Sequence, residues 1–336
     1  MKKRINYTNF NCPLEGTTLI EGIRGVNGSN KVYVSGALVI SSELTCGLLY
    51  EGPLDFNGLE GKWHQLTFTA EGVENVVNTS CYGPNGLENG DVQLVGAYQA
   101  NGSSNNMGFF YEGPADGSGT WTTISPNQGE TEMVFVHSVM GGYAVGNYDT
   151  KPTNGFAFLY NIKTQEFTDI AVKNADTTTL YGIWHNEGPS YTLAGGCSLQ
   201  GISQAFIVDW DSETGRTSNW KIYQYLNEKT KSLITHFEGI TSDGNGGYNL
   251  ASDWVAIDAQ NGTHIAQDGA FVNIQRNQDG TFSEAEWVEL GFPVQGVTAT
   301  SANTAFENNI LGIYTLPHST NGTKSNYTLG FTATIV

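Results

Sequence analysis

The segment Thr235-His-Phe-Glu-Gly-Ile240 is one copy of a short motif that returns along the whole chain and ends at glycine or another small residue. Successive copies are roughly 43 to 65 residues apart, which is the spacing of a repeat architecture. The six copies are Thr18–Ile23, Asn78–Gly83, Phe135–Val139, Thr179–Ile183, Thr235–Ile240 and Thr300–Ala305. Because repetition at such a period indicates one structural unit used many times, this motif decides the fold class.

Each copy is followed by three more segments that have the composition of β-strands. After the first copy come Lys31–Gly36, Gly47–Glu51 and, beyond a turn, Trp63–Phe68. Four strands per unit is the pattern of a propeller blade. Glycine supplies 42 of 336 residues, which suits tight turns, and no stretch has the periodicity of an amphipathic helix. The sequence therefore predicts an all-β, six-bladed β-propeller that forms one domain over residues 1–336, with five or seven blades as alternatives.

The sixth unit lacks a fourth strand, because the chain ends at Val336. We expect the N-terminal segment Ile5–Phe10, which precedes the first unit, to supply that strand. Pairing of the first and last segments in one blade would close the propeller and leave no open sheet edge there.

The chain has a formal net charge of −18, from 15 basic and 33 acidic side chains. Such a surface repels phosphate groups, so we expect neither nucleic acid nor a membrane as a partner. No apolar run is long enough to span a bilayer. The partner that we expect is a small-molecule substrate, and the oligomeric state stays open.

Seven Asn-x-Ser/Thr sequons predict a secreted protein, although the residues after Met1–Arg4 are not the apolar core of a signal peptide. The four cysteines, Cys12, Cys46, Cys81 and Cys197, have no CxxC spacing. We therefore expect no metal site, no cofactor, and either one or two disulfides or buried thiols.

The recurring motif supplies the first strand of each unit, which in a propeller lines the central channel with alternate side chains. The inward position that aligns between the copies is occupied by Glu21, Cys81, His137, Tyr181, Glu238 and Asn303. The inward position two residues earlier is occupied by Leu19, Thr79, Phe135, Thr179, His236 and Ser301. This density of polar residues predicts either a binding site or a water-filled channel whose polar walls satisfy each other.

Five of these residues are candidates for catalysis. Glu21 and Glu238 are a possible carboxylate pair for acid–base chemistry. His137 and His236 are the better candidates for proton transfer near neutral pH, and Tyr181 is a further acid.

The loops between second and third strands are expected to open beside the same channel. They carry aromatic and acidic residues, namely Tyr98, Tyr148, Asp149, Asp253, Trp254 and Tyr314. Such rings offer a flat apolar face with a polar edge, which suits a small organic or sugar ligand. We predict that they bind substrate together with Thr79, Thr179, Ser301 and Asn303.

The segment from Val136 to Asp149, together with Thr235–Ile240 and Thr300–Asn303, resembles a group of secreted β-propellers from bacteria and fungi. The chain is also similar to fungal hetero-Diels–Alderases of tropolonic sesquiterpenoid biosynthesis. That resemblance implies a cofactor-independent enzyme that promotes dehydration to a tropolone quinone methide and its cycloaddition with a humulene-type alkene. No catalytic residue of that family is matched by position.

Two other functions stay open. In a lectin-like, carbohydrate-binding propeller, Tyr98, Tyr148, Trp254 and Tyr314 would stack on sugar rings. In a glycoside hydrolase, the two carboxylates would be Glu21 and Glu238, or Asp149 and Asp253.

Overall fold

The computed structural model describes residues 3–26, 28–54, 57–126, 131–151, 154–225, 232–257, 263–320 and 323–336. All of the regular elements in these ranges are β-strands, as the composition predicts. The same ranges contain no helix that could cross a membrane. The chain divides into two compact units. The N-terminal unit comprises Phe10–Ala171 and Thr177–Tyr181, and the C-terminal unit comprises Met1–Asn9, Val172–Asp176 and Gly182–Val336.

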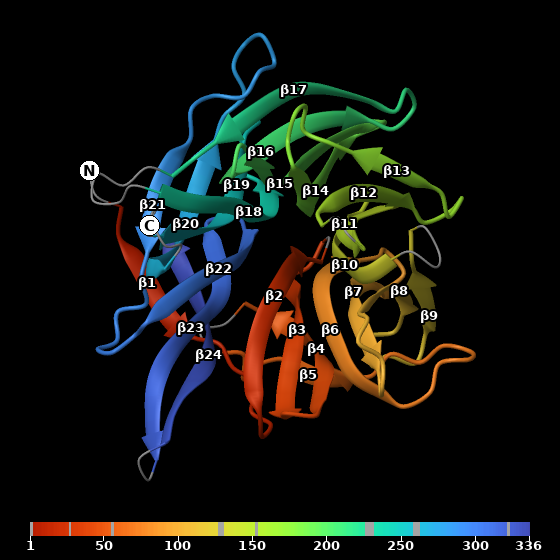
Figure 1. Ribbon diagram of the computed structural model, residues 1–336, viewed down its shortest axis with the longest axis vertical. Coiled ribbons are helices and arrows are strands. Elements are labelled where there is room, and N and C mark those ends of the chain that lie inside the picture. Colours follow the sequence, from red (N-terminus) through yellow and green to blue (C-terminus); the bar gives the residue numbers. More distant parts are fainter. Residues whose placement is uncertain are drawn as a thin grey trace. The chain divides into compact units, whose positions relative to one another are not determined.

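The N-terminal unit contains two sheets (Figure 1). The first has eight strands: β2 (Thr17–Gly25), β3 (Lys31–Ser41), β4 (Leu44–Pro53), β5 (Lys62–Leu66), β6 (Val76–Gly86), β7 (Val92–Ala100), β8 (Met107–Gly113) and β9 (Thr120–Ile124). The second has four: β10 (Thr131–Met140), β11 (Tyr143–Thr150), β12 (Phe156–Asn161) and β13 (Phe167–Ile170). Within each run of four, consecutive strands pair antiparallel.

The remaining strands form three four-stranded sheets, and all but the first residues of β14 belong to the C-terminal unit. The first sheet is β14 (Thr177–Glu187), β15 (Ser190–Leu199), β16 (Ile202–Asp211) and β17 (Arg216–Tyr223). The second is β18 (Ser232–Ser242), β19 (Tyr248–Ile257), β20 (His264–Ile274) and β21 (Glu286–Leu290). The third is β22 (Ala299–Phe306), β23 (Asn309–Thr320), β24 (Thr323–Ile335) and β1 (Ile5–Asn9).

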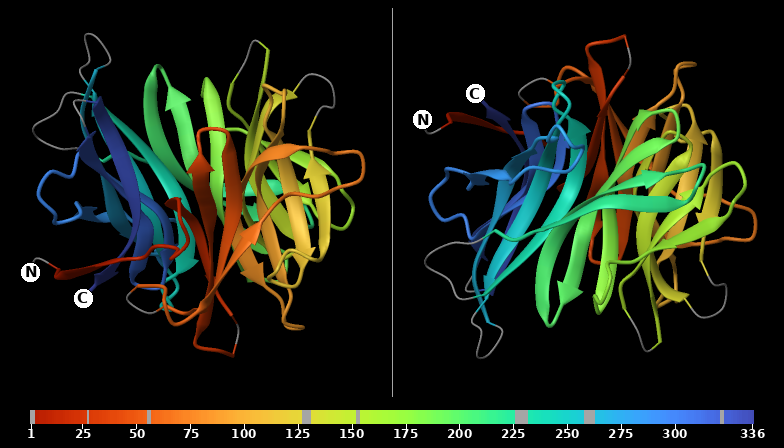
Figure 2. Two further views of the ribbon diagram at one scale, coloured as in Figure 1. Left: turned by 90° about the horizontal axis from the view of Figure 1, so that it is seen from below. Right: turned by 90° about the horizontal axis from the view of Figure 1, so that it is seen from above.

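The N-terminal strand completes the last sheet, as predicted. β1 pairs antiparallel with β24, from Ile5 opposite Ile335 to Asn9 opposite Phe331. The two ends of the chain therefore lie side by side (Figure 2). The Asn9 side chain also accepts a hydrogen bond from Tyr314 Oη at 2.8 Å, which ties β1 to β23.

Successive four-stranded antiparallel runs, with the last completed by the N-terminal strand, are the strand order of a β-propeller. The predicted count of six separate blades requires a correction. The structure contains four separate four-stranded sheets and one sheet of eight strands. The eight strands form one sheet because Thr45 of β4 and Asn78 of β6 pair in a parallel bridge between two antiparallel runs.

A β-bulge interrupts the first strand of five of the antiparallel runs. The register shifts lie between Ile20 and Gly22 in β2, and at corresponding points of β6, β10, β18 and β22. The extra residue at each bulge is Glu21, Tyr82, His137, Glu238 or Asn303. Bulges change the direction of a side chain, and they are frequent beside functional sites.

The glycine that ends the recurring motif follows from close packing of neighbouring first strands. A Cβ on Gly22 of β2 would lie 1.9 Å from the carbonyl oxygen of Tyr82 in β6. A Cβ on Gly83 of β6 would lie 2.6 Å from the carbonyl oxygen of His137 in β10. Backbone atoms cannot move aside as a flexible side chain can, so these two positions require glycine.

All four cysteines are free thiols, so the disulfide alternative is wrong. Cys12, Cys81 and Cys197 are buried, and burial raises the pKa of each of these thiols.

Candidate functional site

Three strands of the C-terminal unit bring together polar side chains that sequence analysis selected. β18 supplies His236 and Glu238, β19 supplies Asp253, and β22 supplies Ser301 and Asn303. His236 lies opposite Asp253 in the register of β18 and β19, and its Nδ1 lies 3.7 Å from Oε1 of Glu238. Asp253 contacts β22 through both of its carboxyl oxygens. We call these five residues the acid cluster.

The Asp253 carboxyl group accepts hydrogen bonds from the Ala302 backbone amide at 2.6 Å and from the Ser301 hydroxyl. Both donors favour the ionised form, yet burial outweighs them and raises the pKa of Asp253 to about 7. The nearby carboxylate of Asp268 raises it further. Asp253 is therefore a carboxylic acid that keeps much of its proton near neutral pH.

The Ser301 hydroxyl links Asp253 to Asn303. Its Oγ contacts Oδ2 of Asp253 and lies 2.6 Å from Oδ1 of Asn303. A hydroxyl group has a single proton to donate. When Asp253 is protonated, it can donate to Ser301, and Ser301 can donate to Asn303, so each oxygen in this chain is satisfied.

The imidazole of His236 packs on the backbone of β15, because a Cβ on Gly196 would lie 2.7 Å from the ring. Burial lowers the pKa of His236, so the ring is neutral at neutral pH. The contact with Glu238 therefore joins a neutral imidazole to a carboxyl group. Proton transfer near neutral pH, which sequence analysis assigned to His236, fits Asp253 better.

A second perturbed carboxyl group lies close to the acid cluster. Burial, followed by the charge of Glu289, raises the pKa of Asp268 to about 6. Asp268 lies on β20 opposite Trp254, one position from Asp253 in the register of β19 and β20. Sequence analysis missed Asp268, because only the sheet register places it beside Asp253.

In the N-terminal unit, the bulges of β6 and β10 bring Tyr82 and His137 together, and Tyr181 of β14 packs against them. The rings of Tyr82 and His137 are stacked with centroids 5.2 Å apart, and His137 meets Tyr181 edge-to-face at 4.5 Å. Glu21 is close enough to Tyr82 to raise the pKa of its phenol, although burial contributes more. Three catalytic candidates, Glu21, His137 and Tyr181, thus share this region.

His137 is unsuited to proton transfer near neutral pH. Its Nε2 donates a hydrogen bond to Oδ1 of Asn147 at 2.9 Å. Burial nonetheless lowers the pKa of His137 to about 4, so the ring is neutral over the physiological range. Its predicted role as an acid–base catalyst is corrected for that reason.

The prediction for β6 was displaced by one residue. Cys81 is fully buried among apolar side chains, and Thr79 is 1% exposed and accepts a hydrogen bond from the backbone amide of Phe68 at 3.0 Å. Tyr82 occupies the bulge position instead. The signal was available, since Tyr82 precedes Gly83 as Glu238 precedes Gly239.

The four aromatic residues that were expected to line the mouth are buried at 5% exposure or less: Tyr98, Tyr148, Trp254 and Tyr314. They pack inside the sheets. Tyr98 stacks on Phe68 with centroids 3.7 Å apart, and Tyr314 stacks on Phe292 at 3.8 Å. Their predicted role as a ligand-binding surface is wrong, because the rings contact the core instead of a ligand.

Two further predicted residues lie away from the acid cluster. Asp149 holds a turn, because its Oδ1 accepts a hydrogen bond from the backbone amide of Gly155 at 2.8 Å. Thr179 is partly exposed, two residues before Tyr181 on β14. Both lie in the N-terminal unit, and their predicted contact with substrate stays a prediction.

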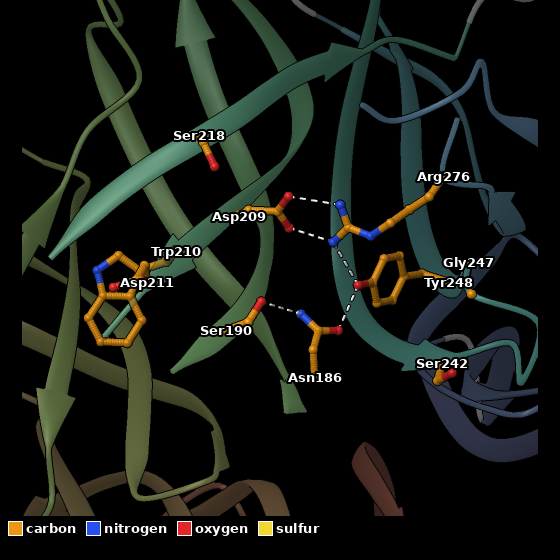
Figure 3. Close-up of a pocket in the computed structure, with 11 residues that line it drawn as sticks. Asn186, Ser190, Asp209, Trp210, Asp211, Ser218, Ser242, Gly247, Tyr248 and Arg276 are labelled. Atoms are coloured by element: carbon orange, nitrogen blue, oxygen red, sulfur yellow. Dashed lines mark hydrogen bonds and ion pairs between the residues drawn. The ribbon is translucent and has the colours of Figure 1, made fainter. Parts of the chain in front are cut away.

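A separate polar cavity of about 480 Å³ lies in the C-terminal unit (Figure 3). Arg276 forms a two-pronged ion pair with Asp209, with Nη–Oδ distances of 2.6 and 2.8 Å, and donates to Tyr248 Oη at 2.9 Å. Tyr248 in turn donates to Asn186 at 2.7 Å. Asp209 raises the pKa of Arg276 further above its usual range. This network neutralises its own charge, so we interpret it as a structural link between β16 and the segment after β20.

No group of three or more His, Cys, Asp or Glu side chains in the described ranges is arranged to hold a metal ion. The acid cluster therefore supplies proton-transfer groups and hydrogen-bonding groups from its own side chains.

No family model matches the chain, and no curated protein matches its sequence. Three solved structures illustrate the matches at the level of the fold. Native arabinanase Arb43A of Bacillus subtilis is 10% identical, with 94% of each chain covered and a TM-score of 0.44. A hypothetical protein from Leishmania major is 13% identical, with 87% of this chain and 96% of that chain covered and a TM-score of 0.46. A GH43 endo-arabinanase from Bacillus licheniformis is 11% identical, with 96% of each chain covered and a TM-score of 0.43. Likenesses with TM-scores below 0.5 carry no argument about function, and they lend no support to the resemblance to hetero-Diels–Alderases.

Proposed function

We propose that the protein is a glycoside hydrolase in which Asp253 is the general acid and Glu238 is the second carboxyl group. Hydrolysis of a glycosidic bond requires one protonated carboxyl group to donate to the leaving oxygen. It also requires one carboxylate to activate water or attack the sugar. The observation that carries the proposal is the raised pKa of Asp253, about 7, beside a strand that presents Glu238.

The hydrogen bonds of Asp253 suit the proton-donating role. Once Asp253 has given its proton to the leaving oxygen, the Ser301 hydroxyl and the Ala302 amide stabilise the resulting carboxylate. Burial alone would hold the proton too tightly, and the two donors bring the pKa back toward neutrality. The neutral ring of His236 lies between the two acidic residues without forming a full ion pair with either.

The aromatic mouth that favoured a hetero-Diels–Alderase or a lectin lies in the interior of the sheets, so neither reading keeps its main support. The acid cluster is retained under the hydrolase proposal. It uses one residue from each of the two carboxylate pairs that sequence analysis suggested.

The proposal is tested on aryl glycosides of common pyranoses and furanoses, followed by the release of the coloured phenol. Asp253→Asn and Glu238→Gln should each lower kcat by about a hundredfold or more, because each removes one half of the acid–base chemistry. Glu284→Gln is the control, since the Glu284 side chain is 92% exposed and pairs with Lys221.

The activity of the unmodified protein should decline as the pH rises past about 7, where Asp253 loses its proton. The proposal is abandoned if no glycoside is hydrolysed, or if Asp253→Asn is as active as the unmodified protein.

We also propose that the eight-stranded sheet corresponds to two blades, which would give six. β2–β5 and β6–β9 are each a run of four antiparallel strands, and β2 and β6 each carry the bulge found in other first strands. A crystal structure that shows any other number of blades would overturn this count.

A further inference from the structure

The N-terminal unit presents four aromatic rings on one side of its first strands. Tyr82 belongs to β6, Phe135 and His137 belong to β10, and Tyr181 belongs to β14. Ring centroids are 6.3 Å apart for Phe135 and both Tyr82 and His137, and the other two contacts are shorter. We call these four residues the aromatic row.

The aromatic row lies on the side of these strands that faces away from the sheet interior. Each of its members is partly exposed, whereas the intervening residues Cys81, Val134, Val136 and Leu180 are 0% exposed. Apolar rings that keep partial exposure beside a fully buried core are available for contact with a ligand.

The aromatic row is uncharged at neutral pH. His137 is neutral because burial lowers its pKa to about 4, and burial raises the pKa of Tyr82 far above neutrality. Arg24 lies near, with Nη2 3.4 Å from Ser138 Oγ, but it is 8% exposed. The charge that accompanies the rings is the carboxyl group of Glu21, beside Tyr82.

We infer that the aromatic row binds the ring of a neutral carbohydrate, an inference that takes its ligand class from the proposed hydrolase function. The C–H face of a sugar ring packs on aromatic rings, and its hydroxyl groups form hydrogen bonds with polar edges. Tyr82 and Tyr181 supply phenolic hydroxyls, and the Nδ1 of His137 is an acceptor because Nε2 holds the proton. Glu21 accepts from sugar hydroxyls and repels an anionic sugar.

Calorimetric titration with cellotetraose and xylotetraose at millimolar concentration tests this inference, with tetragalacturonic acid as the anionic comparison. The titration uses Asp253→Asn, so that hydrolysis does not consume the ligand, and adds ring substitutions to it. At least one neutral tetrasaccharide should bind, and tetragalacturonic acid should bind more weakly. Tyr82→Ala and Phe135→Ala should each weaken binding by about tenfold, the loss of one aromatic contact.

Tyr82→Phe keeps the ring and should weaken binding less than Tyr82→Ala. Phe156→Ala is the matched control, since Phe156 is a 37% exposed ring of the same unit on β12. Melting curves identify any variant that fails to fold, and Phe135→Ala and Tyr82→Phe provide independent readings.

The outcomes separate the two proposals. If neither neutral tetrasaccharide binds, or if Tyr82→Ala and Phe135→Ala bind as well as Phe156→Ala, the aromatic row is not a carbohydrate site. If a tetrasaccharide binds through the row but no glycoside is hydrolysed, the hydrolase proposal fails and this inference stands. If glycosides are hydrolysed with no effect of the ring substitutions on binding, the reverse holds.

Discussion

At the scale of a single residue, Asp253 is subject to two opposing influences. Burial disfavours its charge, and the donors Ser301 and Ala302 favour it. The net result is a pKa that rises from 3.8 to about 7 on folding. Between those two pH values the folded protein keeps a proton that the unfolded chain has lost. The free energy of unfolding therefore falls as the pH rises through this window.

Asp253→Asn should remove this pH-dependent loss of stability. The Asn amide can donate to Ser301 and accept from Ala302, as the protonated acid does. Urea unfolding should show the variant to be more stable than the unmodified protein by a few kcal/mol near pH 8, and by little near pH 4.

Asp211→Asn provides a control of the opposite sign. The Thr214 backbone amide and hydroxyl lower the pKa of Asp211, so its charge stabilises the folded state above the unfolded pKa. This variant should lose stability at neutral pH. A difference between Asp253→Asn and the unmodified protein that stayed constant with pH would contradict the assigned pKa.

At the scale of the element, the bulged first strand is the recurring device of this fold. It directs Glu21 or His137 away from the sheet interior and places a small residue where the next strand approaches. Gly22→Ala should lower the free energy of unfolding by about 1–3 kcal/mol, because its Cβ would collide with the backbone of β6.

Thermal and urea unfolding measure this effect. Gly291→Ala is the comparison, since a Cβ there would meet only Asp268, at an ordinary 3.7 Å. Equal stability of the two variants would show that close approach is not what selects glycine in the motif.

The same elements explain which parts of the fold sequence analysis could predict. The repeat period and the N-terminal strand were readable, because both depend on the order of strands. Cys81 was placed wrongly because a bulge adds one residue, and that shifts every later side chain to the other face. Tyr98 and Tyr148 were misassigned because β7 and β11 are buried on both faces, so the alternation that would distinguish inside from outside is absent.

The acid cluster was predictable in composition but not in chemistry. His236, Glu238, Ser301 and Asn303 were selected from their positions in the repeat. The protonation of Asp253 depends on Ala302, a backbone amide 49 residues away along the chain, and on burial. Neither can be read from the residues around Asp253.

At the scale of the whole molecule, the dominant feature is a net charge of −18 on 336 residues. Charges of one sign repel each other more in the compact state than in the unfolded chain, so this excess destabilises folding. Salt screens the repulsion, because the Debye length falls from about 30 Å at 0.01 M to about 8 Å at 0.15 M.

Raising NaCl over that range at neutral pH should therefore raise the Tm by several degrees, as followed by differential scanning calorimetry. KCl and tetramethylammonium chloride should act equally, since screening depends on ionic strength and not on the identity of the cation. The increase should vanish near pH 4.5, the isoelectric point calculated from the composition, where the net charge is small. An increase that persisted at pH 4.5, or that required one particular cation, would point to specific ion binding instead of self-repulsion.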